Sequence, residues 1–484
     1  MCARCHSRRG QIHEDYVHGQ PVGDDYRVAL LDDELYFSDG QIKGEVYEYG
    51  SFIQSRMFHA GVTCSDCHDP HSLRLRAEGN GVCLQCHAAQ KYNSILHNFH
   101  KAGSLGSRCV ECHMPTRTYM VVDARRDHSI RIPRPELSVK LGVPNTCNEC
   151  HRDRSTLWAA NTVAKWYGHQ PVGFQRFADA LHAGSIGAPG ASESLARLIV
   201  DHEQPAIARA SALALMAGNP GSATVALRNG ASDPSPLVRR AAARALPHSD
   251  PRMSVRTLPP LLNDGVRSVR IEAAEALAGA PADALPNDTA AALRRAIDEY
   301  VAAQELTADR PESHINLALL FIREKRFAEA RGELMAALSL DPAFAPAAVN
   351  LADLDREVGR DADSEWVLRD ALDRSPKDAS LHHALGLLLV RQGRGRKALD
   401  QLADAARLDP TNARFAYVYA IALDDTGQTE KALKVLQANA TRHPYDRDSL
   451  AALTNLYRRA GDWAKAAVYA KRLAELEPND TRWR

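Results

Sequence analysis

One short pattern accounts for every cysteine of this 484-residue chain, and it constrains the fold more than any other feature. Cys-x-x-Cys-His occurs five times, at Cys2/Cys5/His6, Cys64/Cys67/His68, Cys83/Cys86/His87, Cys109/Cys112/His113 and Cys147/Cys150/His151. Two thiols at this spacing can each bond one vinyl group of a haem, and the histidine that follows can coordinate the iron from the same side. The pattern therefore predicts five covalently attached c-type haems.

Two other uses of cysteine pairs explain the pattern less well. A zinc ribbon also contains Cys-x-x-Cys pairs, but zinc requires neither a histidine directly after every pair nor an odd number of pairs. A thioredoxin-like dithiol needs one pair between a strand and a helix, whereas this chain has five pairs and no cysteine left over. Both alternatives are weaker than haem attachment.

The density of the motifs limits what else the N-terminal region can contain. Five haems would share about 160 residues, roughly 30 residues each, whereas a chain needs about 40 residues to support a core of its own. We therefore expect residues 1–165 to form a loop-rich pentahaem cytochrome domain in which porphyrin supplies much of the core. Two helical repeat regions follow, so the chain is predicted to be mainly α.

Residues 172–285 carry the first set of repeats. Segments at Arg209, Arg239 and Arg270 each read as an apolar residue and an arginine followed by an alanine-rich helix, at nearly equal intervals. The small alanines would let neighbouring helices approach closely. This pattern resembles HEAT-like helical pairs, although the usual HEAT period is longer, about 40 residues or more.

A stricter repeat fills residues 286–484. Prolines recur at a constant interval, and small residues and glycines keep the same interval in two further registers; the prolines are Pro342, Pro376, Pro410, Pro444 and Pro478. The interval is that of tetratricopeptide repeats, whose period is about 34 residues. Five repeats are expected from about 311 to 480, stacked as an α-solenoid whose concave side can dock a protein partner. The alternative is that these repeats act only as a spacer.

Charge and hydropathy exclude some partners and suggest a location. The 60 basic and 60 acidic residues balance, so no basic footprint indicates nucleic-acid binding. No run of about 18 apolar residues occurs, so we expect no membrane span in this chain. Because c-type haem is normally attached after export, a periplasmic or other extracytoplasmic location is expected. The first motif begins at Cys2, which leaves no room for a signal peptide, so we expect an upstream part to be missing.

Histidines gather around the motifs. Residues 1–151 hold twelve of the 20 histidines, five in the motifs and seven elsewhere. This enrichment predicts a second histidine on the far side of the irons, which suits electron transfer and gives lower potentials than a methionine ligand. The expected distal ligands are His71, His97, His100 and His128. The further candidates are His13, His18 and His59, which could be ligands here, ligands of a haem in the missing upstream part, or surface residues. The i, i+3 spacing of His97 and His100 predicts that both lie on one helical face.

Several stretches resemble multihaem cytochromes with appended tetratricopeptide repeats. They are residues 47–52, 60–71, 79–80, 109–115 and 126–128. The haem part is similar to the cytochrome c-554 type domain, in the wider group that contains hydroxylamine oxidoreductase and pentahaem nitrite reductase. The resemblance covers residues 1–160 closely and the repeats generically. It implies closely packed haems that form an electron wire, with the motif histidines as proximal ligands and His71, His100 and His128 as distal ones.

Three functions compete. The leading one is an electron-transfer cytochrome that docks a redox partner protein through its repeats. The second is an oxidoreductase of a small nitrogen or sulfur compound, with a catalytic haem here or upstream; nitrite reductases of the wider group replace a motif histidine by lysine, and no such motif occurs here. Tyr92, Tyr119, Arg125 and Arg126 could line a distal pocket, with propionate pairing and core packing as the plainer explanation. A scaffold with structural haems is disfavoured by the haem density.

Overall fold

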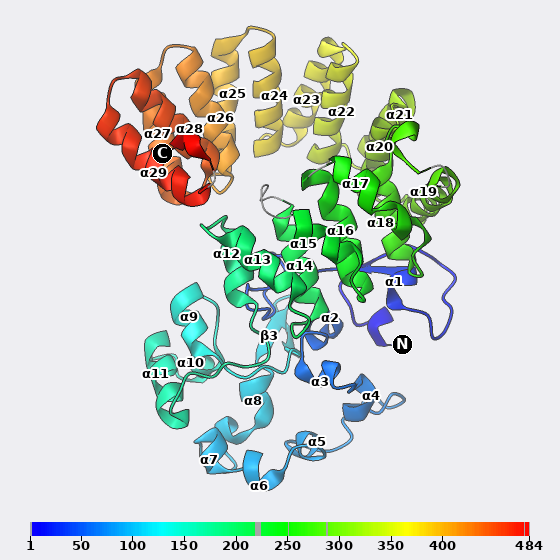
Figure 1. Cartoon of the computed structure of the whole chain (residues 1–484), viewed down its shortest axis with the longest axis vertical. Coiled ribbons are helices and arrows are strands. Elements are labelled where there is room, and N and C mark those ends of the chain that lie inside the picture. Colours follow the sequence, from blue (N-terminus) through cyan, green and yellow to red (C-terminus); the bar gives the residue numbers. More distant parts are fainter. Residues whose placement is uncertain (1, 218–223, 250, 287–288, 479, 484) are drawn as a thin grey trace. The chain divides into compact units, whose positions relative to one another are not determined.

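A computed structural model describes all residues except 1, 218–223, 250, 287–288, 479 and 484. For residues 224, 248, 249, 251 and 282 it describes the backbone but not the side chains. The described chain is mainly helical, as the sequence predicts (Figure 1). It forms two compact units. The first comprises Met1–Ser185, Ala191–Leu277 and Ala282–Ala296, and the second comprises Ile186–Gly190, Ala278–Pro281 and Ile297–Arg484.

The motif-bearing part of the first unit is built from short elements, because glycine, proline and asparagine interrupt its sequence every few residues. Two small antiparallel pairs, β1 with β2 and β3 with β4, are its only sheets among the described residues. The strands are β1 (Arg9–Gln11), β2 (Tyr26–Val28), β3 (Thr116–Tyr119) and β4 (Asp123–Arg126). The helices are η1 (Cys2–Arg4), α1 (Val22–Asp25), α2 (Glu48–Phe52), α3 (Arg56–His59), α4 (Cys64–Cys67), α5 (Gly81–Leu84), α6 (Ala89–Tyr92), α7 (Ile95–Asn98), η2 (Leu105–Ser107), α8 (Cys109–His113), α9 (Pro135–Leu141), α10 (Thr146–Cys150) and α11 (Thr156–Tyr167).

The segment from α3 to α8 has no protein core. Residues 56–114 are all described, and none of them is buried. Large apolar side chains are exposed to solvent instead; Leu96 is 82% exposed and Leu73 is 74% exposed. Burial of apolar surface is the main force that holds a chain folded. This segment therefore needs an additional apolar body to pack against, as the density of the motifs predicts.

Alanine-rich helices with a buried ion-pair ladder form the rest of the first unit. Arg209 donates both terminal nitrogens to the Asp233 carboxylate, and Arg239 repeats the pairing with Asp264 at 2.6 Å. Each arginine thus binds an aspartate 24 or 25 residues further along the chain. The helices are α12 (Ala178–Ser185), α13 (Ala191–Val200), α14 (Ala206–Met216), α15 (Thr224–Ala231), α16 (Pro236–Ser249), α17 (Pro251–Thr257), η3 (Pro259–Asn263), α18 (Arg267–Leu277) and η4 (Ala282–Ala284).

This helical layer anchors the N-terminal residues. The Leu31 amide donates to Ser211 Oγ at 2.9 Å, and Arg240 Nη2 donates to the Val28 carbonyl at 2.6 Å, both in buried surroundings. Buried polar groups require such partners, so these bonds fix how the start of the chain lies on α14 and α16. The residues that precede the segment without a core are therefore attached to well-packed helices.

Five helix pairs make up most of the second unit and stack in sequence order (Figure 1). The helices are α19 (Thr289–Glu305), which begins in the first unit, and then α20 (Pro311–Arg323), α21 (Phe327–Leu340), α22 (Ala345–Glu357), α23 (Asp361–Arg374), α24 (Ala379–Arg391), α25 (Gly395–Leu408), α26 (Ala413–Asp425), α27 (Thr429–Arg442), α28 (Arg447–Arg459) and α29 (Trp463–Leu476), followed by η5 (Thr481–Trp483). The small residues that recur at the repeat interval are all buried in the second helix of each pair; they are Ala330, Ser364, Ala398, Ala432 and Ala466.

The turn within each pair shows why glycine recurs at the same interval. Gly359, Gly393, Gly427 and Gly461 adopt φ values of 72–82°, which glycine tolerates better than any other residue. In the first pair the equivalent position is Lys325, whose φ is also positive at 60°. The turn geometry is therefore kept even where the glycine is absent.

Candidate haem-binding sites

Each Cys-x-x-Cys-His motif folds as a single helical turn. In four motifs the amide of the motif histidine donates to the carbonyl of the first cysteine at 2.9–3.0 Å, and in the fourth motif of the chain the same residues form α8. Local caps support these turns: the Thr63 amide donates to Asp66 Oδ2 at 2.7 Å, and Asn145 Oδ1 accepts from the Asn148 amide at 3.1 Å. A helical turn places residues i and i+3 on one face. Both thiols of each motif therefore face the same side.

The cysteines also show how the motifs follow one another. The Cys83 thiol hydrogen-bonds to that of Cys109, which raises the pKa of Cys83 and lowers the pKa of Cys109 to about 7. Burial raises the pKa of Cys112 to about 11, and the neighbouring Cys147 adds to the effect. The Cys2 and Cys64 thiols are hydrogen-bonded in the same way, whereas Cys67 lies close enough to Cys86, and Cys112 to Cys147, for their charges to interact. The five motifs are thus arranged in space in the order of the sequence.

Cys5 is one of four predicted attachment residues whose side chains are exposed. Helix η1 ends at Arg4, so Cys5 lies just beyond it, where its amide donates to the Cys2 carbonyl at 3.1 Å. Its side chain is exposed, as are those of Cys2, Cys86 and Cys150, whereas the other six cysteines are half-buried. Attachment of haem at Cys5, as at the other nine cysteines, depends on the motif spacing and stays a prediction.

Three motif histidines each face a second histidine at nearly the same distance. The ring centroids are 6.4 Å apart for His68 and His128, 6.1 Å apart for His97 and His113, and 6.3 Å apart for His100 and His151. The ring planes are inclined by only 31°, 10° and 35°. One member of each pair belongs to a motif, and the other is one of the predicted distal ligands.

This distance fits a metal ion between the rings. A metal–nitrogen bond of about 2 Å on each side, plus ~1.2 Å from each nitrogen to its ring centre, places the centroids about 6.4 Å apart. Two imidazoles are one ligand set that gives a low-spin haem iron. No group of three or more His, Cys, Asp or Glu side chains within the described ranges could hold a metal ion, as a zinc ribbon would need. The donor set therefore fits haem.

The second ring nitrogen of several of these histidines is already bonded. Nδ1 of His113 lies 2.7 Å from the Arg131 carbonyl, Nδ1 of His128 lies 2.9 Å from the Arg126 carbonyl, and Nδ1 of His100 lies against the Asn98 carbonyl. A carbonyl can only accept, so each Nδ1 carries the proton and each Nε2 keeps its lone pair. This is the usual arrangement around a metal-binding histidine.

Partial burial keeps these rings neutral as well. It is the main cause that lowers the pKa of His97, His113 and His128 below the ordinary histidine value. Only the neutral imidazole can bind a metal ion through its free nitrogen. The chain thus holds these residues in the protonation state that iron binding needs.

The expectation that His97 and His100 share one helical face is wrong. Helix α7 ends at Asn98, and Phe99 turns the chain with a left-handed backbone conformation (φ 54°, ψ 23°). Because of this turn, His97 faces His113 of the fourth motif while His100 faces His151 of the fifth. Two histidines close together in the sequence therefore serve two different sites.

Two motif histidines have no histidine opposite them within the described residues. His6 Nδ1 lies 2.9 Å from Glu48 Oε2, and the His87 ring lies edge-on to Tyr92 at 5.4 Å. The remaining candidate ligands lie apart: His13 contacts Asp25 at 3.3 Å, His18 and His71 are exposed, and His59 packs against Phe174. As iron ligands, these four residues stay predictions.

The charged and aromatic candidates near the motifs have ordinary partners. Arg126 pairs with Glu111 at 2.7 Å, and Arg125 pairs with Asp123 at 2.6 Å and lies over the Tyr119 ring. Tyr119 is buried, and Tyr92 contacts the rings of His87 and His97. Arg126 contributes to the site through its backbone, because its carbonyl accepts a hydrogen bond from His128 Nδ1.

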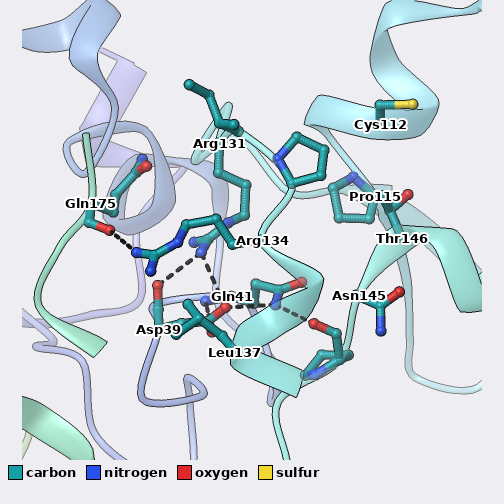
Figure 2. Close-up of a pocket in the computed structure, with 13 residues that line it drawn as sticks. Asp39, Gln41, Cys112, Pro115, Arg131, Arg134, Leu137, Asn145, Thr146 and Gln175 are labelled. Atoms are coloured by element: carbon teal, nitrogen blue, oxygen red, sulfur yellow. Dashed lines mark hydrogen bonds and ion pairs between the residues drawn. The ribbon is translucent and has the colours of Figure 1, made fainter. Parts of the chain in front are cut away.

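A small pocket beside the fourth motif contains an arginine that the sequence did not single out. Figure 2 shows Arg131 among the lining residues, with Cys112 at the rim and Asp39 below. Arg131 Nη1 donates to the Asp39 carbonyl at 2.8 Å, while its buried Nη2 has no hydrogen-bond partner in the described part of the chain. Arg131 thus places a buried cation beside the fourth motif. Its carbonyl also orients His113, the histidine of that motif.

No signal in the sequence selects Arg131. Other arginines of the region lie just as close to a motif, and nothing local distinguishes this one from them. Its place in the pocket depends on contacts with Asp39, which lies 92 residues earlier in the chain.

Comparisons with known families agree with this organisation. The doubled CXXCH motif matches residues 57–92, HEAT repeats match residues 224–308, and tetratricopeptide repeats match residues 311–344 and 389–444. The doubled motif is of the haem-binding type and indicates covalent attachment of haem. The tetratricopeptide repeats indicate interaction with other proteins. None of the described helices has the length and apolarity needed to cross a membrane.

Individual relatives are similar over limited parts of the chain. The Vi polysaccharide export protein VexE of Salmonella typhi is 31% identical over 130 residues, which is 26% of this chain and 20% of that protein. The chain thus spans about a fifth of the length of this curated relative. Among solved structures, MamA is 19% identical over 34% of this chain and 96% of its own, with a TM-score of 0.30. The pilF protein of Pseudomonas aeruginosa is 21% identical over 39% of this chain and 86% of its own, with a TM-score of 0.33. Neither comparison with a solved structure bears on function.

Proposed function

We propose that this chain is a multihaem c-type cytochrome that conducts electrons along five covalently attached haems and docks a protein partner through its repeat solenoid. One observation carries the proposal: three motif histidines face a second histidine at 6.1–6.4 Å, the separation that suits an iron between them. Haem supplies an iron that can take up and release one electron. The residues described above determine where that iron lies and which ligands it has.

The protein's own part is attachment, orientation and order. The ten cysteines tether the haems, and the carbonyls of Asn98, Arg126 and Arg131 orient the axial histidines. At the three paired sites, two imidazoles would leave no position on the iron free for a substrate, and such an iron rearranges little on reduction. Because consecutive motifs adjoin one another, electrons would pass along the five sites in sequence order.

Attachment of haem also supports an extracytoplasmic location, since the thiols must be supplied with haem after export. The partner would dock on the tetratricopeptide solenoid. Trp366 and Trp463 support this part of the proposal, because both are large aromatic side chains about two-thirds exposed, at 68% and 66%. Aromatic residues of this kind often carry much of the binding energy at protein interfaces.

The haem count tests the proposal directly. The full chain, exported from a host that attaches c-type haem, is denatured, treated with an alkylating reagent and weighed by mass spectrometry. We expect the mass of the polypeptide plus five haems and no alkylated cysteine. The variant Cys64→Ser/Cys67→Ser should lose one haem and keep four. A chain without haem and with ten alkylated thiols would overturn the proposal. Nitrite and hydroxylamine, added to the intact holoprotein, should leave its absorbance spectrum unchanged; a shift would favour an oxidoreductase instead.

A further inference from the structure

Three aromatic residues hold together the segment that carries both His97 and His100. The Phe99 ring stacks on the Trp166 ring with centroids 4.6 Å apart and planes inclined by 7°. It also meets the Tyr167 ring edge-on at 5.6 Å. Phe99 lies between the two histidines, while Trp166 and Tyr167 form the last turn of α11. We call these three residues the aromatic clamp.

The clamp reaches both histidines as well as Phe99. The Tyr167 hydroxyl donates to the His97 carbonyl at 2.6 Å, and the Trp166 ring meets the His100 ring edge-on at 5.8 Å. At the other end of α11, the Trp158 ring lies 5.1 Å from the ring of His151, the motif histidine that faces His100. Helix α11 therefore contacts both members of the His100–His151 pair.

Phe99 has a backbone conformation that explains why a clamp is needed. Its φ of 54° lies in the left-handed region, which is sterically unfavourable for a residue with a bulky side chain. Such a conformation persists only where the surroundings hold it in place. If the backbone relaxed at Phe99, His97 and His100 would both move away from their partner histidines, because they lie on either side of Phe99.

We infer that Phe99, Trp166 and Tyr167 are positioning residues, which divide two nearby histidines between two irons. Their stacking holds the left-handed turn, and the turn directs His97 toward the fourth motif and His100 toward the fifth. This inference rests on the proposed function, since it takes His97 and His100 as axial ligands. It adds that α11, which contains no ligand of its own, determines whether both irons have two ligands.

The test uses the full holoprotein and electron paramagnetic resonance, which separates low-spin from high-spin haem. Trp166→Ala and Trp166→Leu should each keep all five haems by mass but move part of the signal of two haems from low to high spin. Trp166→Phe, which can still stack, should retain the low-spin signal. The matched control is Trp483→Ala, which removes a tryptophan from η5 and should leave the spectrum unchanged.

Two further measurements keep the test decisive if a Trp166 variant is not recovered. Phe99→Gly permits the left-handed turn but removes the ring, so it should show the same gain of high-spin signal. Added imidazole should return that signal to low spin, because it replaces a histidine that has left the iron. If the wild type is low-spin and Trp166→Leu and Phe99→Gly are indistinguishable from it, the inference is wrong while the proposed function stands. A wild type without low-spin haem would contradict the proposed function itself.

Discussion

The buried ion pair between Arg209 and Asp233 offers a prediction whose size follows from the structure. Both side chains are 5% exposed, and the arginine donates two terminal nitrogens to the carboxylate. Arg209→Ala would leave Asp233 with the amide of Ser235, at 2.8 Å, as its nearest remaining donor. Removing one partner of a buried pair costs about 3–5 kcal/mol, because an uncompensated charge stays behind.

Hydrogen exchange measures this loss where it should occur. The Arg209–Asp233 pair lies among α13 to α16, so the slowest amides of α14 and α16 report its opening. Since each 1.4 kcal/mol is about a tenfold change, their exchange should quicken by roughly 140-fold to 3,700-fold in Arg209→Ala. The matched control is Arg407→Ala, which breaks an exposed pair with Asp404 and should change exchange by less than about fivefold, or under ~1 kcal/mol. Equal effects of the two variants would refute the reasoning.

The remaining predictions concern the ligands, the solenoid turns and pH. His97→Ala and His100→Ala should each convert one different haem to high spin, and the double variant should convert two, by electron paramagnetic resonance. Lys325→Gly should raise the stability of the solenoid by about 0.5–1 kcal/mol in chemical denaturation, because Lys325 has a φ of 60° where the other repeats have glycine. Burial, helped by the charge of Arg414, lowers the pKa of His383 to about 4. The His383 imidazole therefore takes up a proton more readily in the unfolded chain than in the folded one. The stability of the folded solenoid that is present above pH ~6.5 should be lost as the pH falls toward 4. After allowance for solvent screening, this loss of stability is about 1–2 kcal/mol. His383→Leu should remove the pH dependence between 6.5 and 4. If the variant and the wild type unfold with the same pH profile, His383 is not its source.

The sequence predicts the repeats well because their information is local and periodic. A constant interval between small residues requires helix pairs that pack at the same points, and those residues are buried in the structure. The helical turns of the motifs are equally local. Haem attachment follows from residue types at fixed spacing, without any knowledge of the fold.

The pairing of the histidines could not be predicted in the same way. His68 faces His128, which lies two motifs further along the chain, and no local pattern connects them. The division of His97 and His100 depends on a left-handed phenylalanine, which the sequence gives no reason to expect. Its support comes from Trp166 and Tyr167, beyond the last motif. Such contacts arise only from the folded chain.

The central claim is that the three histidine pairs are axial ligands of haem iron. Electron paramagnetic resonance of the oxidised holoprotein, compared with the triple variant His97→Ala/His100→Ala/His128→Ala, tests it most directly. We predict that the variant keeps five haems by mass and that three of them pass from low to high spin. A low-spin signal of unchanged intensity would show that these histidines do not bind iron, and the account would be wrong.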